Sequence, residues 1–394
     1  MVVDSDGRIY VAGGAQLLRL LPDGQVDTSY QTNVLTGSVW ALALQPGGKL
    51  LLGGALSKVG TNRVKRLARL KPDGTFDENF KPVMSAEVQC IIVDPDAKML
   101  TIGGRFVTVN GVTRRSIARM DFAGTLNTTF QPTAISGEVF GLAPGTNGMV
   151  TAVGSLATSG WGGTRIARFF ADGSLDTSYA PTANNIVVGI VSLADGSAVI
   201  SSEFTTIDGV ARSRIAKLQP NGSLDLGFNA SLNAFTPFLS QSTDGTFVVS
   251  GEFSTVNGVK RSKVARLGAD GSLIYGYDTY FNPTGSSVFC HALQLDGRVL
   301  VGGTFSRVSN IPRQYLARLH REPVLQPLID GNDILLLWSA SFIGFKLERT
   351  SNPEDAGSWE AVQESPGLNS TFPVPYFTLT NSISNTNCFY RLKQ

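Results

Sequence analysis

A period of about 50 residues constrains this chain more than any other feature. The triplet Ala-Arg-Leu, or a close variant, recurs at spacings of 49 to 52 residues. A fixed period of this length is typical of stacked supersecondary units. The seven copies are Leu18-Arg19-Leu20, Ala68-Arg69-Leu70, Ala118-Arg119-Met120, Ala167-Arg168-Phe169, Ala216-Lys217-Leu218, Ala265-Arg266-Leu267 and Ala317-Arg318-Leu319.

Each period contains four short apolar runs separated by turn signals. In the second copy the first two are Val39 to Leu44 and Lys49 to Gly54, and the third carries the triplet. Asn-Gly pairs such as Asn257-Gly258 predict tight hairpin turns, because both residues tolerate a positive φ. A fourth strand is predicted after an Asp-Gly turn, ending in an aromatic residue such as Phe80. Four antiparallel strands per period are typical of a β-propeller blade.

One such sheet buries too little surface to be stable alone, so the blades must pack face to face. We therefore expect an all-β, seven-bladed propeller over residues 1–320. The last copy lacks a fourth strand and the first begins partway through its first strand. We expect that residues upstream of Met1, including a signal peptide, are missing, or that the ring closes imperfectly.

The repeated motifs resemble a known family. G-x-F-x-x-V-N-G-x-x-R-x-x-I-A-R-L followed by D-G-S-L-D-x-x-F is similar to the delta-60 repeat of bacterial proteins, which resembles β-propellers and has no settled biochemical role. Ser250 to Tyr277, Gly103 to Phe130 and Ser202 to Phe228 match closely. The first copy lacks the V-N-G-x-x-R insertion, and the fourth replaces it with residues 159–163.

The period ends near Glu322, and prolines punctuate a linker at residues 321–327. Residues 328–394 then carry five strand-like runs. Their pattern resembles a fibronectin-like or immunoglobulin-like β-sandwich, in which Trp338 would lie in the core. The predicted strands are Ile334 to Ser339, Phe345 to Arg349, Trp359 to Val362, Tyr376 to Leu379 and Cys388 to Leu392.

Composition argues against several functional classes. A net charge of +2 gives no field that would attract nucleic acid or an anionic membrane. No apolar run is long enough to span a bilayer. Cys90, Cys290 and Cys388 are too scattered for a disulfide framework, and we interpret the first two as small buried residues.

Recurring charges are better explained by structure than by chemistry. The basic residues of the triplets could bind polysaccharide carboxylates, but aspartates such as Asp27 and Asp77 recur within reach, which favours structural ion pairs. The segments Asp73 to Asp77 and Asp172 to Asp176 suggest Ca²⁺, although each supplies few of the required ligands. We therefore predict no cofactor, with Ca²⁺ as the alternative.

Residues at which the copies disagree are the candidate ligand-binding positions. His291 replaces an aliphatic residue, and Trp161 lies in the altered fourth copy. Glu87 and Glu138 precede the first strands of neighbouring blades, where they could form an acid pair at the channel mouth. If His291 has only a structural role, it is a partly buried, hydrogen-bonded side chain. The innermost strands otherwise offer almost no catalytic groups.

Two functions remain open. The sequence favours a non-catalytic, monomeric scaffold outside the cell or on its surface, which presents propeller loops to a protein or polysaccharide. We predict neither a nucleic-acid partner nor a transmembrane segment. The alternative is a propeller hydrolase or lyase with a metal near the channel mouth.

Overall fold

A computed structural model describes most of the chain. The described residues are 1–13, 15–31, 33–94, 96–132, 135–158, 163–274, 281–282, 285–308, 311–319, 325–330, 333–339, 346–355, 357–363, 367–369, 376–382 and 388–393. They form two compact units, of which the larger ends at Leu319. The described helical structure is one 3-10 turn at Thr146–Gly148, so no described helix could span a membrane.

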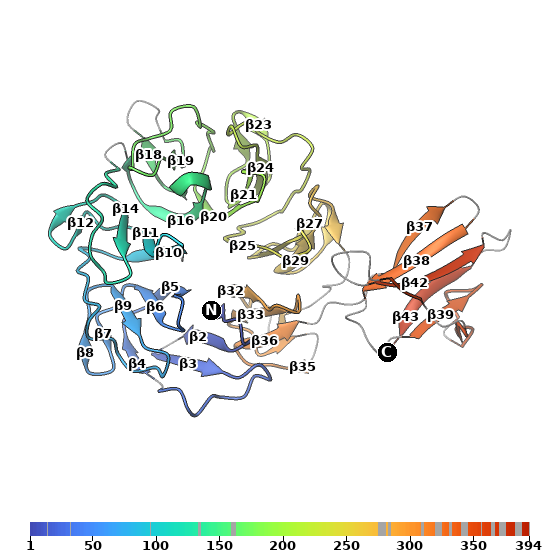
Figure 1. The fold of residues 1–394 in the computed structure, drawn as a ribbon. Coiled ribbons are helices and arrows are strands. Elements are labelled where there is room, and N and C mark those ends of the chain that lie inside the picture. Colours follow the sequence, from blue (N-terminus) through green and yellow to red (C-terminus); the bar gives the residue numbers. More distant parts are fainter. Residues whose placement is uncertain are drawn as a thin grey trace. The chain divides into compact units, whose positions relative to one another are not determined.

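Figure 1 shows the larger unit as a ring of radial sheets, which we number blade 1 to blade 7 in chain order. The predicted seven-bladed, all-β propeller is therefore confirmed. The inner strands of the blades are β1 (Val2–Val3), β5 (Val39–Leu44), β10 (Val88–Asp94), β16 (Val139–Pro144), β20 (Val187–Ser192), β25 (Phe238–Gln241) and β32 (Val288–Leu293).

Two further strands continue each blade outward by antiparallel pairing. The second strands are β2 (Ile9–Gly13), β6 (Leu50–Gly54), β11 (Met99–Gly104), β17 (Val150–Gly154), β21 (Ala198–Ser202), β26 (Phe247–Ser250) and β33 (Val299–Gly303). The third strands, which carry the triplets, are β3 (Gln16–Leu20), β9 (Leu67–Leu70), β14 (Ile117–Asp121), β19 (Ile166–Phe169), β24 (Ile215–Leu218), β29 (Val264–Leu267) and β36 (Leu316–Leu319).

The predicted fourth strand is wrong in detail. In blades 1 to 5 it is reduced to one bridge, such as Leu70 to Phe76, and in blade 6 to the short strand β30 (Leu273–Ile274). The chain then turns at Asp77, whose carbonyl accepts a hydrogen bond from the Phe80 amide. The aromatic residue therefore ends a turn instead of a strand, and its ring fills the space between blades.

The Asn-Gly signals form small hairpins between the second and third strands. In blade 3, Asn110 and Gly111 both have positive φ, as a two-residue hairpin turn requires. The described hairpins are β7 (Lys58–Val59) with β8 (Asn62–Arg63), β12 (Thr108–Val109) with β13 (Val112–Thr113), β22 (Thr206–Ile207) with β23 (Val210–Ala211), β27 (Thr255–Val256) with β28 (Val259–Lys260), and β34 (Arg307–Val308) with β35 (Ile311–Pro312).

Segments that link neighbouring blades pair mostly with these hairpins. Leu35 of the linking strand β4 (Asn33–Thr36) pairs with Val59 of β7. The other described short strands are β15 (Ile135–Ser136), which pairs with β18 (Ala157–Thr158), and β31 (Phe281–Asn282), which pairs with β34.

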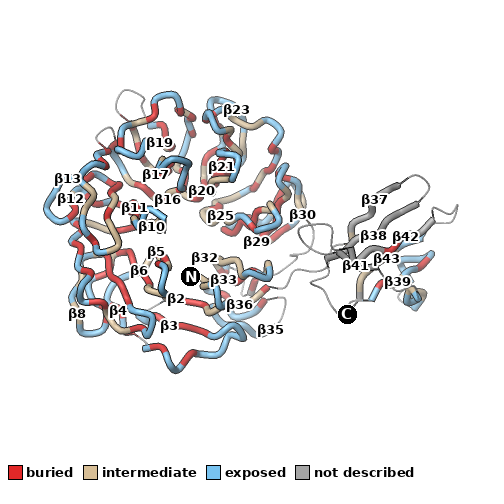
Figure 2. The backbone as a smooth tube through the Cα atoms, viewed as in Figure 1, coloured by how far each residue is buried: buried red, intermediate tan, exposed pale blue. Residues whose placement is uncertain are grey.

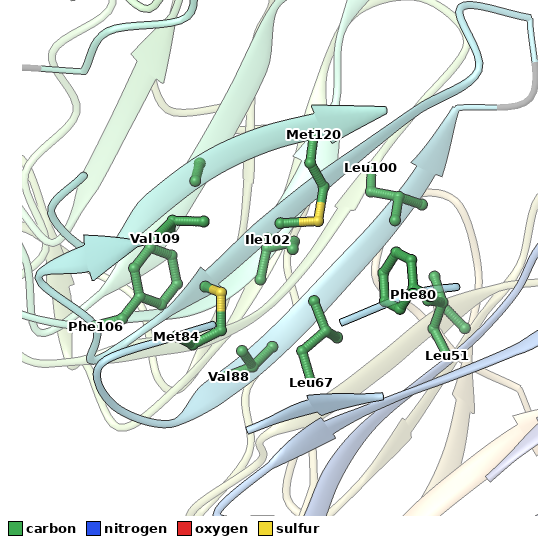
Figure 3. Packing of buried hydrophobic residues seen from close by; sticks show 12 residues of the cluster. Leu51, Leu67, Phe80, Met84, Val88, Leu100, Ile102, Phe106, Val109 and Met120 are labelled. Carbon is green, nitrogen blue, oxygen red and sulfur yellow. The ribbon is translucent and has the colours of Figure 1, made fainter. Parts of the chain in front are cut away.

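Apolar cores lie between neighbouring blades. Figure 2 marks the buried residues of the chain in red. Figure 3 shows the core between blades 2 and 3, where Leu51 and Leu67 meet Phe80, Leu100 and Met120. The last and first blades pack in the same way, because Leu300 of blade 7 clusters with Ile9 and Leu20 of blade 1. The described blades therefore form a closed ring.

In blades 1 to 4 and in blade 7, the triplet arginine fastens its blade to the next by donating to a backbone carbonyl there. Arg19 donates hydrogen bonds to Asp27 of its own blade and to the Pro72 carbonyl of blade 2. Its guanidinium also lies 4.3 Å from the centre of the Tyr30 ring. Arg318 of blade 7 donates in the same way to the Pro22 carbonyl of blade 1. The basic ring is therefore part of the blade interfaces, as the structural interpretation predicted.

The smaller unit contains two antiparallel sheets, described here by themselves. One has the order β37 (Gln326–Asp330), β38 (Asp333–Ser339), β42 (Tyr376–Ser382), β41 (Gly367–Asn369), and the other β40 (Glu360–Ala361), β39 (Lys346–Thr350), β43 (Phe389–Lys393). Leu336 and Leu379 of the first sheet pack with Leu347 of the second.

The predicted linker at residues 321–327 is too long. Gln326 and Pro327 begin the edge strand β37, where a proline is tolerated because one side of the strand needs no amide donor. The side chain of Trp338, predicted to lie in this core, is outside the described residues.

Candidate functional site

The same irregularity occurs in five inner strands. In each, one residue bulges out of the ladder just after the strand begins, as between Val39 and Ala41 in blade 2. A bulge leaves its extra residue unpaired and redirects its side chain. The bulged residues are Trp40, Gln89, Phe140, Val188 and Phe289.

These bulged residues surround the channel at the end where the inner strands begin, which we call the mouth. A cavity of about 670 Å³ opens there. Its walls include Trp40, Gln89, Val188, Phe235, Pro237, Phe238 and Phe289. A second cavity of about 620 Å³ shares Trp40, Gln89 and Phe289 with the first and is lined also by Cys90 and His291.

The channel lining corrects one expectation from strand alternation. Side chains of a regular strand point alternately to opposite faces, so only one face, with residues such as Cys90 and Gly141, would be expected to line the channel. Both Gly141 and its neighbour Leu142 line it. The sheets are radial, so the edge of each inner strand faces the axis and residues of both faces reach the cavity.

Two aromatic side chains at the mouth are unusually open to solvent. Trp40 is 49% exposed and Phe289 is 58% exposed. Large aromatic groups are normally buried, because each buries 150–250 Å² when covered. Exposed aromatic rings beside a cavity are typical of a ligand-binding surface.

Charged side chains form the rim of the mouth. Arg105 directs its guanidinium to the Glu138 carboxylate at 2.9 Å, and its backbone amide donates to the Glu87 carbonyl. Lys263 pairs with Glu252 at 2.7 Å. Arg105 and Glu252 also line the mouth cavity, so a bound molecule would meet both signs of charge.

The predicted acid pair has an arginine bound to both of its members. Arg105 contacts Glu138 by its side chain and Glu87 by its main chain, so Glu138 has a cationic partner of its own. Within the described residues, no three His, Cys, Asp or Glu side chains lie close enough together to hold a metal ion. The Glu138 carboxylate is therefore held in an ion pair with Arg105.

His291 lies deeper in the channel, and both of its ring nitrogens have partners in blade 6. Nδ1 is 2.7 Å from the Ser250 hydroxyl, and Nε2 is 2.9 Å from the Ser240 hydroxyl. Burial lowers the pKa of His291 to about 4, so the ring is neutral at pH 7. This geometry matches the partly buried, hydrogen-bonded histidine described above.

Among the remaining predicted positions, those that the structure describes lie in turns, ion pairs or the channel wall. Trp161 is outside the described residues. Asp73 accepts hydrogen bonds from the amide and hydroxyl of Thr75, while Asp77 pairs with Arg69. Both carboxylates of this Ca²⁺ candidate are thus engaged in a turn and an ion pair. Cys90 and Cys290 are half-buried in the channel wall and are not joined by a disulfide.

Sequence reasoning did not single out Trp40, Gln89, Arg105 and Phe289, which line the mouth cavity. A signal was present, because the position after the first valine of each inner strand varies as Trp, Gln, Phe, Val and Phe while its neighbours stay small or aliphatic. Such variation at one position of a repeat indicates that the fold does not require a particular residue type there.

Comparison with known families and structures supports the fold. The family model "Domain of unknown function (DUF5122) beta-propeller" matches residues 5–30, 45–80, 96–130, 146–179, 193–228, 243–273 and 294–321. The WD40 β-propeller domain of Doa1 aligns with 82% of this chain and 91% of its own, at 14% identity and a TM-score of 0.55. Virginiamycin B lyase from Staphylococcus aureus aligns with 76% of this chain and 91% of its own, at 13% identity and a TM-score of 0.46. No curated protein matches the sequence.

Proposed function

The chain belongs to the DUF5122 β-propeller family, and from the geometry of its channel mouth we propose that it is a non-catalytic binding protein for a protein or glycan. One observation carries this proposal. Bulges in the inner strands hold Trp40 and Phe289 half-exposed beside a cavity of about 670 Å³. Covering such rings on binding stabilises a complex by removing apolar surface from water.

The polar groups of the rim support binding more than catalysis. The Arg105 guanidinium and the Glu252 carboxylate can each form hydrogen bonds with a ligand while they stay paired with Glu138 and Lys263. His291 is held between two hydroxyls, and its low pKa makes it a weak base at pH 7.

We further propose that this role is exercised outside the cell or at its surface. In this proposal the smaller unit is a fibronectin-like spacer or attachment module. Its two packed antiparallel sheets support the assignment. Detection of the protein in the culture medium or on intact cells tests the location.

Truncation of the mouth aromatics tests the proposed function. Binding to glycan and peptide arrays should weaken about thirtyfold in Trp40→Ala, because truncating a central aromatic anchor costs about 2 kcal/mol. Leu226→Ala is the matched control, since Leu226 is 70% exposed but does not line the mouth cavity. Equal binding by both variants would contradict a ligand site at the mouth.

A further inference from the structure

The charge of the chain is unevenly distributed around blade 2. No acidic residue occurs between Asp27 and Asp73. Within this interval, the hairpin region of blade 2 carries Lys58, Arg63, Lys65 and Arg66. The net charge of +2 for the whole chain conceals this local excess of positive charge.

The cations of this region are available to a ligand. Lys58, Arg63 and Lys65 are exposed and Arg66 is half-buried. None of the four pairs with an acidic side chain among the described residues. Lys49, by contrast, binds Asp77.

The hairpin region of blade 2 borders the hairpin of blade 3. Lys65 bridges to Val83 of the linking segment, and Met84 beside it bridges to Val109 of hairpin β12–β13. We call the surface formed by Lys58, Arg63, Lys65 and Arg66 the basic hairpin patch.

The patch and the mouth are connected across blade 2. Val39, next to Trp40, pairs with Gly54, and the Gly54 amide donates to the Arg66 carbonyl. Two strand spacings, or about 10 Å, therefore separate the backbones of Val39 and Arg66. A chain molecule can therefore contact the Trp40 ring and the patch at the same time.

We propose that the partner is a polysaccharide containing uronic acid, which stacks one sugar ring on Trp40 and places carboxylates along the basic hairpin patch. This inference rests on the proposed binding function and specifies the ligand. The apolar face of a sugar ring suits an exposed indole, and lysine and arginine donate charge-assisted hydrogen bonds to carboxylates.

The rim favours a glycan over a nucleic acid. Glu87, Glu138 and Glu252 lie on the mouth side of the same ring, and their carboxylates would repel a chain with one charge per nucleotide. Polysaccharides with one carboxylate per disaccharide can instead present neutral hydroxyls to these acids. Carboxylates accept hydrogen bonds from hydroxyls.

The test measures binding of hyaluronate oligomers, which carry one carboxylate per disaccharide, by calorimetry. The patch variant combines Lys58→Gln, Arg63→Gln and Lys65→Gln. Its control, Lys71→Gln with Lys81→Gln and Lys98→Gln, removes the same charge from other exposed lysines. We expect the patch variant to bind about tenfold more weakly than the wild type, and the control variant to bind as the wild type does. Binding by the wild type and both variants should weaken at higher salt, because exposed charges are screened.

The outcomes separate this inference from the proposed function. Loss of uronate binding in both the patch variant and Trp40→Ala supports it. Equal affinity for carboxyl-reduced hyaluronate, tighter binding of a thymidine oligonucleotide through the patch, or no uronate binding would overturn it. Array binding that depends on Trp40 but not on the patch would leave the mouth as a site and refute the uronate ligand.

Discussion

At the scale of single residues, the most informative position is the acidic partner of each triplet cation. Asp77 binds Arg69 in blade 2, and Asp176 binds Arg168 in blade 4. Blade 3 has Asn127 at this position, so Arg119 donates to the Thr101 hydroxyl and to carbonyls instead. Its guanidinium lacks a carboxylate partner among the described residues.

Asn127→Asp should therefore stabilise the protein. A carboxylate beside the half-buried Arg119 would restore the pair that other blades have, which we expect to raise the free energy of unfolding by about 1 kcal/mol. Denaturant unfolding measures the change. Asp176→Asn is the reverse exchange and should destabilise blade 4, and a loss of stability in both variants would contradict this account.

His291 makes stability depend on pH. Burial lowers its pKa in the folded protein from 6.5 to about 4, so the unfolded chain binds a proton at a higher pH than the folded chain does. Stability is complete above pH 6.5 and falls as the pH drops toward 4. Unfolding free energies between these values should decline less steeply in His291→Gln, which cannot titrate, and identical slopes would refute the role of His291.

Single-residue chemistry was only partly predictable from the sequence. The aspartates that pair with the triplet cations were recognisable, because both partners recur with the blade. The exposure of Trp40 and Phe289 was not, since it depends on a bulge whose extra residue has no distinctive composition. Periodicity indicates which residues share a face only while the ladder stays regular.

At the scale of secondary-structure elements, the blades share a second irregularity. A residue other than glycine has positive φ directly before the third strand in six blades: Arg66, Ser116, Arg165, Arg214, Lys263 and Tyr315. Side chains in this conformation cost roughly 1–2 kcal/mol. Several of them reach back to the rim, as Lys263 does to Glu252 and Arg214 to the Glu203 carbonyl.

Arg66→Asn should relieve this strain. Asparagine tolerates a φ of 71° better than arginine, so we expect unfolding to require about 1 kcal/mol more free energy. Lys65→Asn is the control, because this neighbouring residue is exposed and is not among the positive-φ positions. Thermal unfolding that shifts equally in both variants would count against backbone strain as the cause.

The sequence located these elements well except at their outer edge. Val39 to Leu44 was predicted with the bounds that β5 has. The Asp-Gly turn before the outer segment was also correct. The prediction of an outer strand was wrong because Asp77 pairs with Arg69 and accepts a hydrogen bond from the Asn79 amide. These contacts turn the chain after a single bridge.

At the scale of the whole molecule, ring closure was the feature that the sequence left open. Copy number indicated seven blades, but pairing between the last and first depends on contacts between distant residues. An apolar core forms there from Ile9, Leu20 and Leu300. Arg318 also donates a hydrogen bond to the Pro22 carbonyl of blade 1. Closure brings Trp40 and Phe289, from blades 2 and 7, to one mouth.

The most direct test of the mouth as a binding site uses tryptophan fluorescence. Of the four tryptophans, Trp161, Trp338 and Trp359 are replaced by phenylalanine to leave Trp40 alone, and a companion variant keeps only Trp359. Both are titrated with the tightest-binding member of the arrays. We predict a saturable change in emission for the Trp40 protein and none for the Trp359 protein, whereas binding that leaves the Trp40 emission unchanged would contradict the account.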